Sequence, residues 1–296
     1  MIKFIKDITL TILLTFILFV FLTNSSLVIN AVNQGISVFV KNVLPSLMPF
    51  FILSDVLLNY KYFDNLKRSF KFKYINFLIV SMISGLPSNA KYLSDMIKNN
   101  SISVSDTSRV LAFSFFPNPM FIIGSVAMLF KSKVYPVIVL GIIYFSSFIV
   151  YLINYKKLED KDYINKNNTI NFFTLLKKSI QNSFSTLLII LGIIVVFSII
   201  INIIKYYLRV NPVILAVINS FLELTTGVKS ISILNISLVY KYTLLALGLS
   251  TSGMSVIMQA FGILSGTKID YKIFIKNKVL LVLISVFFTF IVFKNI

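Results

Sequence analysis

Two acidic residues lie within otherwise apolar stretches of this chain and are the first candidates for chemistry. Asp55 lies in the run 50–58 and Glu223 in the run 213–224, at a spacing of 168 residues. A carboxylate in hydrocarbon is costly and persists mainly where it lines a polar cavity or a solute path. Such a group can bind a coupling cation, carry a proton or contact a solute. For Asp55 the alternative is an acid at a helix end near the membrane surface.

Two serine-glycine pairs repeat the same spacing. Ser84-Gly85 and Ser252-Gly253 are also 168 residues apart, and each follows an apolar run and precedes a turn and a cationic helix. Unwound backbone within a membrane is tolerated where it lines a cavity, as in transporters built from internal repeats. The shared order of acid, break, turn and cationic helix predicts a duplicated fold with broken or re-entrant helices at its centre, and the alternative is a chance match of one offset.

Further polar residues lie beside these breaks. A helix that restarts after a break presents free amide groups to an anion, and Lys91 is placed to meet such an anion or to pair with a carboxylate. The alternative for Lys91 is a lysine that reaches the lipid headgroups. Asn118 lies between two prolines, where it marks either a third break or an ordinary turn. The candidate substrate-binding or coupling residues are Asp55, Ser84, Gly85, Pro87, Ser88, Asn89, Lys91, Asn118, Glu223, Thr225, Thr226, Ser252, Gly253 and Gln259.

The composition determines the class of protein that must position these residues. The chain has 296 residues, of which 57% are hydrophobic and 13% are charged, against roughly 25% charged residues in an average soluble domain. Its mean hydropathy is +0.90. Continuous apolar runs, several near the length that spans a bilayer, predict an all-α polytopic membrane protein with about seven to nine helical segments.

Charge divides the chain into parts. The formal net charge is +18, but Lys and Arg gather between apolar runs, at 61–73 and 156–178, which is typical of cytoplasmic loops. No nucleic-acid partner is inferred. The predicted parts are an N-terminal membrane helix and outer loop at 1–34, a first half at 35–155, a basic cytoplasmic linker at 156–174 and a second half at 175–296.

The chain has no cysteine and no histidine. It therefore has no disulfide, no thiol nucleophile and none of the commonest general base and metal ligand, so that no cofactor or metal is expected and proton coupling would use carboxylates. A Gly-x-Ser-x-Gly elbow is also absent. A transporter is favoured over a non-transporting membrane scaffold, and a membrane-embedded enzyme is the least favoured class.

Five ordered motifs resemble those of the YlbJ-type sporulation integral membrane proteins, in the broader group with nucleoside-recognition, or Gate, domains. The resemblance implies two Gate-like halves, a role in endospore maturation at the cell membrane or a forespore-associated membrane, and transport of a small anionic solute such as dipicolinate. A homo-oligomer remains open. The motifs are Leu44-Pro45-Ser46-Leu47-Met48-Pro49, Ser84-Gly85-Leu86-Pro87-Ser88-Asn89-Ala90-Lys91, Asn118-Pro119-Met120-Phe121, Phe221-Leu222-Glu223-Leu224-Thr225-Thr226-Gly227 and Ser265-Gly266-Thr267.

Overall fold

The protein was analysed as a computed structural model that describes residues 11–12, 15, 17–59, 74–86, 88–98, 102–159, 171–207 and 210–296. These residues form thirteen α-helices and two π-helices, so the predicted all-α class is confirmed. The structure divides the apolar runs into more helices than the sequence predicted, because several runs are interrupted by short non-helical breaks. Pro87, the basic cluster at 61–73 and most of the basic linker lie outside the described residues.

The described part of the first half begins with two helices joined by a π-helix and ends with one long helix. Its elements are α2 (Ser25–Val38), η1 (Phe39–Val43), α3 (Leu44–Asn59), α5 (Ile75–Ser84), α6 (Ser88–Lys98), α7 (Val104–Phe113), η2 (Phe121–Val126), α8 (Ala127–Leu129) and α9 (Val134–Tyr155). The second half consists of α10 (Phe172–Tyr207), α11 (Pro212–Leu222), α12 (Leu224–Ser232), α13 (Leu238–Thr251), α14 (Gly253–Ile263) and α15 (Tyr271–Lys294).

Several helices are long and apolar enough to cross a membrane. Within the described residues there are four such segments, Val134–Tyr155, Phe172–Tyr207, Leu238–Ile263 and Tyr271–Lys294, or up to five if a bent pair near the N-terminus counts as one span. Large apolar side chains such as Leu188, Leu283 and Phe287 are exposed on these helices. Lipid tails suit such surfaces, so the chain is a multi-pass membrane protein.

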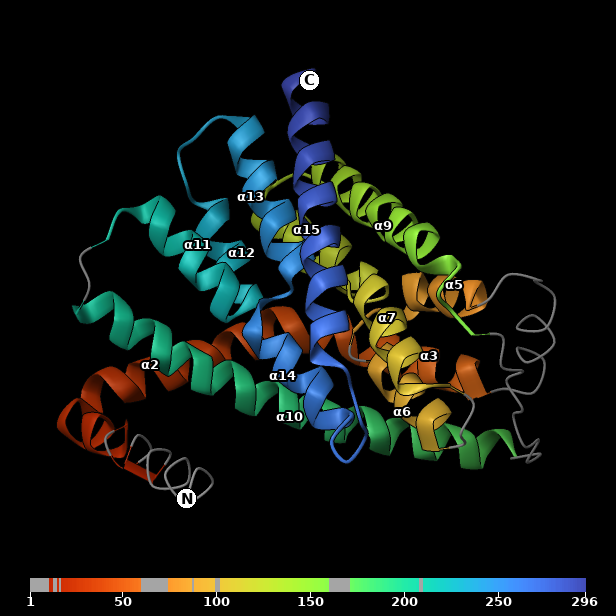
Figure 1. Ribbon diagram of the computed structural model, residues 1–296. Coiled ribbons are helices and arrows are strands. Elements are labelled where there is room, and N and C mark those ends of the chain that lie inside the picture. The colour runs from red at the N-terminus through yellow and green to blue at the C-terminus, as the bar shows by residue number, and fades with distance from the viewer. Residues whose placement is uncertain are drawn as a thin grey trace.

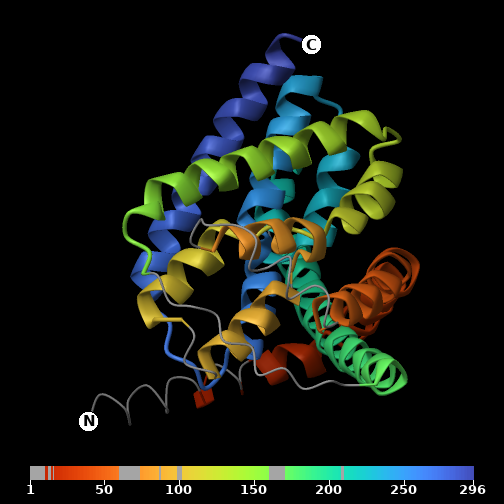
Figure 2. The same cartoon turned by 90° about the vertical axis from the view of Figure 1, so that its right-hand side faces the viewer.

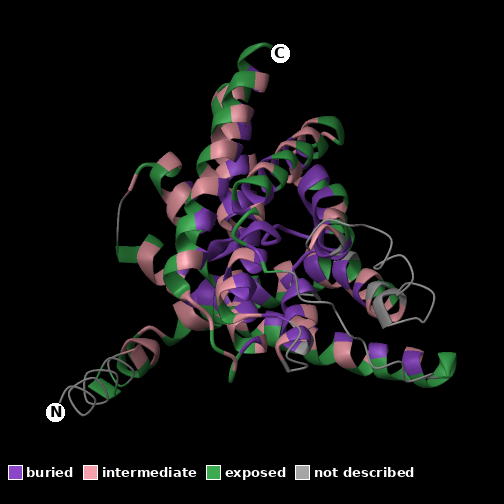
Figure 3. Ribbon diagram, turned by 45° about the vertical axis from the view of Figure 1, so that its right-hand side comes forward, coloured by how far each residue is buried: buried purple, intermediate pink, exposed green. Residues whose placement is uncertain are grey.

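The long helices surround the short ones. α15 packs against α13, α7 and α9, while α10 packs along α2 and α3. Figures 1 and 2 show that α10 runs in a direction steeply different from that of α15. The buried segments gather in the middle of the molecule, where the short helices meet (Figure 3). The places at which the short helices are interrupted therefore lie inside the molecule, whereas parts of these helices reach its surface.

The segment 23–35, predicted as an outer loop, is helical. The chain bends by 101° between Ile17–Thr23 and Ser25–Val43, with Asn24 at the bend. Helix α2 then packs against α10, and a β-carbon on Gly35 would lie 3.2 Å from the Val195 α-carbon. The loop prediction rested on the absence of charge, but close packing of a small residue against a neighbouring helix needs no charge.

The helix order recurs, although not at the spacing that the sequence suggested. α5 and α11 begin 137 residues apart, as do α9 and α15, and each set contains two pairs of short helices before a long one. This order matches the break at Ser84-Gly85 with the break at Glu223. The equivalence of Asp55 and Glu223 is wrong, because Asp55 lies inside the continuous helix α3 whereas Glu223 lies between two helices. Glycine, Pro-Asn and a capping glutamate each end a helix, so equal spacing of similar residue types does not identify corresponding helix ends.

Candidate functional site

The break after α5, at Ser84-Gly85, and the break after α7, around Asn118, form the first pair and contact one another through their backbones. Helix α5 ends at Ser84, and Gly85 has φ 60° and ψ −169°, a combination that is accessible essentially to glycine alone. A β-carbon on Gly85 would lie 2.5 Å from the Asn118 α-carbon. The side-chain amide nitrogen of Asn118 donates to the Ser84 carbonyl at 2.8 Å. The backbone N–H of Leu86 donates to the Phe116 carbonyl at 3.2 Å. The predicted break at Asn118 is thereby confirmed.

Two asparagines satisfy backbone groups that these breaks leave without helical partners. The Asn118 side-chain oxygen accepts from the Met120 N–H at 2.8 Å, so both ends of its amide are used. Asn89 donates to the Ser114 carbonyl at the end of α7, at 2.5 Å. Orphan carbonyls at helix ends are costly to bury, and a side-chain amide compensates for them without introducing charge.

The third break, between α11 and α12, contains a buried carboxylate. Glu223 is only 2% exposed and has extended backbone, with φ −142° and ψ 120°. One carboxylate oxygen accepts from the Thr225 N–H at 2.9 Å and the other from the Thr226 N–H at 2.6 Å. A carboxylate is favoured at the positive N-terminal end of a helix. The amide groups of α12 therefore already hold a carboxylate of the chain itself.

The fourth break packs against the third. Ser252 has φ 67° and Gly253 has φ 68°, and helix α14 starts directly after the turn. A β-carbon on Gly253 would lie 3.1 Å from the Leu224 backbone nitrogen, and one on Gly227 would overlap the Ser220 backbone. Glycine thus permits two interrupted segments to cross at close range. The prediction that helices end or restart at the Ser-Gly segments is confirmed.

A pocket of about 50 Å³ lies where both pairs of breaks meet. Glu223, Thr225, Asn118 and Gln259 form its polar wall. Gln259 is 5% exposed, and its side chain lines the pocket. The other lining residues are apolar and come from η1, α3, η2, α10, α14 and the breaks: Val43, Leu47, Leu86, Pro117, Phe121, Ile190, Ile194, Leu224 and Val256.

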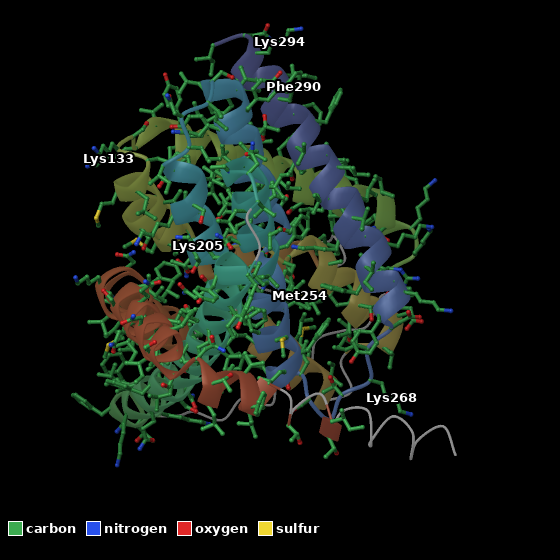
Figure 4. All side chains as sticks on the ribbon, turned by 90° about the vertical axis from the view of Figure 1, so that its left-hand side faces the viewer. Lys133, Lys205, Met254, Lys268, Phe290 and Lys294 are labelled. Carbon is green, nitrogen blue, oxygen red and sulfur yellow. The ribbon has the colours of Figure 1, made fainter. Side chains whose placement is uncertain are left out.

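The depth of the fourth break follows from the two ends of α15. Figure 4 shows Lys268 near one end of this helix and Lys294 at the other, with Met254, in the first turn of α14, between them. Charged residues at both ends of an apolar helix are typical of a membrane span. The fourth break consequently lies between the ends of a candidate span.

Asp55 and Lys91 form an ion pair away from this pocket. The Lys91 ammonium lies 3.1 Å from one Asp55 oxygen, and Asn182 of α10 donates to the other oxygen at 3.3 Å. The pair joins α3, α6 and α10, and neither residue lines the pocket. Glu223 lines the pocket and Asp55 does not, so the prediction that the two carboxylates share a central cavity is wrong. Asp55 lies two helical turns beyond Leu47, the last lining residue of α3.

The remaining candidates lie close to the breaks. Ser84 and Gly85 contact Asn118 but do not line the pocket. Thr226 donates its backbone N–H to the Glu223 carboxylate, and Ser252 directly precedes α14. Ser88 lies in the first turn of α6. Outside these candidates, Asp106 and Arg109 form an ion pair three residues apart on α7, at 3.1 Å.

One functional candidate was missed by the sequence-based predictions. Lys278 is only 6% exposed, and its ammonium donates to the Phe115 carbonyl at 2.5 Å. In the sequence it is one of several lysines at the start of the last helix. Its position in a stripe with the buried residues Phe274, Leu281 and Ser285 is the signal that distinguishes it from its exposed neighbours.

The fold and its buried polar breaks define a multi-pass helical membrane protein with interrupted helices. No protein-family model matches the chain, and no solved structure matches it. A curated relative is the sporulation integral membrane protein YlbJ of Bacillus subtilis (strain 168), which is 25% identical over 316 aligned residues, covering 89% of this chain and 77% of the relative. This similarity confirms the relationship to the YlbJ-type proteins that the motifs predicted.

Proposed function

We propose that this protein transports a small solute across a membrane during sporulation, at the cell membrane or a forespore-associated membrane. The observation that carries the proposal is the meeting of both pairs of helix breaks at one polar-walled pocket. Transporters with interrupted helices hold solutes at such places, because unwound backbone is tolerated in a membrane where it lines a cavity. The sporulation role is supported by the name of the relative.

The proposed solute is a small anion, and dipicolinate is the candidate that the resemblance implies. The Gln259 amide can donate to a solute carboxylate, and the Thr225 hydroxyl is available beside it. The Glu223 carboxylate opposes a second negative charge in the same pocket. We therefore propose that Glu223 takes up a proton as the anion enters and then donates a hydrogen bond to it, which couples the anion to a proton.

The pocket must widen for transport. One water molecule needs roughly 10–15 Å³ of such volume, so a pocket of about 50 Å³ has room for a few water molecules rather than for an aromatic dicarboxylate. The contacts that close it include the hydrogen bonds between Asn118 and Ser84 and between Leu86 and Phe116. Separation of the two pairs of breaks is the motion that would admit a solute.

The experiment is uptake of labelled dipicolinate into vesicles that contain only this purified protein, with pyridine-2,6-dimethanol as an uncharged analogue. Gln259→Leu is expected to lower uptake about tenfold or more, because a lost hydrogen bond to a charged group costs roughly 1.5–3 kcal/mol. Gln181→Leu, on the exposed face of α10, is the matched control. A folded, monodisperse protein without uptake above protein-free vesicles contradicts transport of this solute and favours the membrane scaffold.

A further inference from the structure

The buried ammonium of Lys278 lies where two interrupted helices end. Helix α7 ends at Phe113, and the Phe115 carbonyl that accepts from Lys278 follows within two residues. Helix α13 ends at Thr251, and the Ser252 hydroxyl lies 3.4 Å from the same ammonium. The last carbonyl groups of a helix lack helical partners and carry the negative end of its dipole. The ammonium thus lies just beyond the C-terminal ends of one helix from each half, at a residue, Ser252, that also precedes α14.

The surroundings of this ammonium resemble those of a bound cation rather than those of an ion pair. No carboxylate among the described residues lies within 4.0 Å of the Lys278 nitrogen. Its contacts are a carbonyl oxygen, a hydroxyl oxygen and the face of the Phe115 ring, whose centroid is 4.3 Å away. Carbonyl oxygens at the C-terminal ends of broken helices coordinate Na⁺ in secondary transporters, and a ring face also attracts a cation.

We propose that Lys278 supplies a cation built into the chain, at a position where an exchangeable ion such as Na⁺ would otherwise bind between the ends of α7 and α13. The site then needs no metal ion to hold the first and second halves together. Lys278 reaches it from α15, which packs against both α7 and α13. This assignment concerns a second site, because Lys278 does not line the pocket of the proposed solute.

The test measures thermal unfolding of the purified full-length protein in detergent, so it does not depend on whether the solute is correct. The unfolding temperature of the unmodified protein should be the same in NaCl, KCl and choline chloride at equal ionic strength. Lys278→Ala should lower it by about 5 °C or more. The alanine variant lacks three methylene groups and the ammonium, which is the size of propylammonium. Propylammonium chloride should therefore restore much of the loss, whereas tetramethylammonium chloride, which cannot donate a hydrogen bond, should not.

Two matched variants separate charge from packing. Lys276→Ala removes an exposed lysine from the same helix and should leave the unfolding temperature unchanged and insensitive to propylammonium. Lys278→Met retains a long side chain without charge and should be destabilised. An unfolding temperature of Lys278→Met equal to that of the unmodified protein overturns the proposal, as does equal rescue of Lys278→Ala by the two ammonium salts.

If neither variant of Lys278 folds, the salt comparison on the unmodified protein still decides. A higher unfolding temperature in NaCl than in choline chloride would show an exchangeable sodium site and contradict a cation built into the chain. Equal temperatures, together with a lower unfolding temperature for Ser252→Ala, would support the proposal, since this variant loses one acceptor of the ammonium.

Discussion

In each half, two interrupted helices pack closely at their breaks, but different side chains bind the backbone groups that the breaks leave without helical partners. In the first half, Gly85 admits the backbone at Asn118, and neutral amides bind the orphan carbonyl groups. In the second half, Gly253 admits the backbone at Leu224, but the helix end is capped by the Glu223 carboxylate. Both pairs contribute to the same pocket, which therefore has a neutral wall and a charged wall.

The two kinds of side chain differ in whether their hydrogen bonds depend on protonation. A neutral asparagine holds a break in one geometry whatever the protonation state of its surroundings. A carboxylate holds a helix end while it is ionised and weakens its hold when it takes up a proton, because its acceptor strength falls. Under the proposed function, a proton-dependent step would therefore belong to the second half and rigid support to the first.

The largest expected effect is on stability, from glycine substitutions. Gly85→Ala forces an alanine into a glycine-only conformation and places its β-carbon 2.5 Å from Asn118, so we expect a loss of about 3 kcal/mol or more. Gly253→Ala should cost less, since its nearest backbone atom is 3.1 Å away. Thermal unfolding in detergent measures both variants.

The control for these substitutions is Gly141→Ala in α9, where a β-carbon meets nothing within 4 Å. Alanine favours a helix over glycine by up to about 1 kcal/mol, so this variant should be as stable as the parent or slightly more stable. Equal losses for Gly85→Ala and Gly253→Ala would contradict the tighter packing of the first half.

The next prediction tests whether the protein remains stable when Asn118, in the neutral wall of the pocket, is replaced by a charged residue. Asn118→Asp removes the N–H that donates to Ser84 and brings a negative oxygen toward that carbonyl, with an expected cost of about 2 kcal/mol. Asn118→Ser removes the amide without adding charge and should cost less. A fully stable Asn118→Asp protein would remove the distinction between the two walls.

Glu223→Gln should have a moderate effect on stability, of about 1 kcal/mol, since the amide retains one oxygen for the cap at Thr225 or Thr226. Its main effect should be on the coupling of transport to protons. Uptake of an anion should lose its dependence on a proton gradient while binding remains. The measurement is vesicle uptake with and without an imposed pH gradient, and retained gradient dependence would exclude Glu223 as the proton carrier.

The smallest effect is expected at the ion pair of Asp55 and Lys91. The pair is partly exposed, so a double-mutant cycle with Asp55→Asn and Lys91→Met should give a coupling of about 0.5 kcal/mol. Because Lys91 contacts Asp55 rather than the pocket, vesicle uptake should fall only as far as protein abundance falls. Lys177→Met, exposed on α10, is the control. A selective loss of uptake would return Lys91 to the solute site.

The sequence by itself determined the membrane class, several of the positions at which helices stop, and the polar residues of the pocket. Long apolar runs require helices in a membrane, and glycine and proline end them locally, so the breaks at Ser84-Gly85, Asn118 and Ser252-Gly253 were recognisable from the sequence. Glu223 was recognised as an acid in an apolar run, but not as a helix end. Gln259 was found as a polar residue in the short segment that follows the break at Ser252-Gly253.

Only the tertiary structure decided which of these residues meet. The spacing of 168 residues joined Asp55 to Glu223, but the fold places Asp55 against Lys91 and Asn182 and leaves Glu223 at the pocket. It also buried Lys278 among helix ends while its neighbour Lys276 stayed exposed. A helix end is a local property of a few residues, whereas the partner of a charge depends on how distant helices cross, which no local spacing encodes.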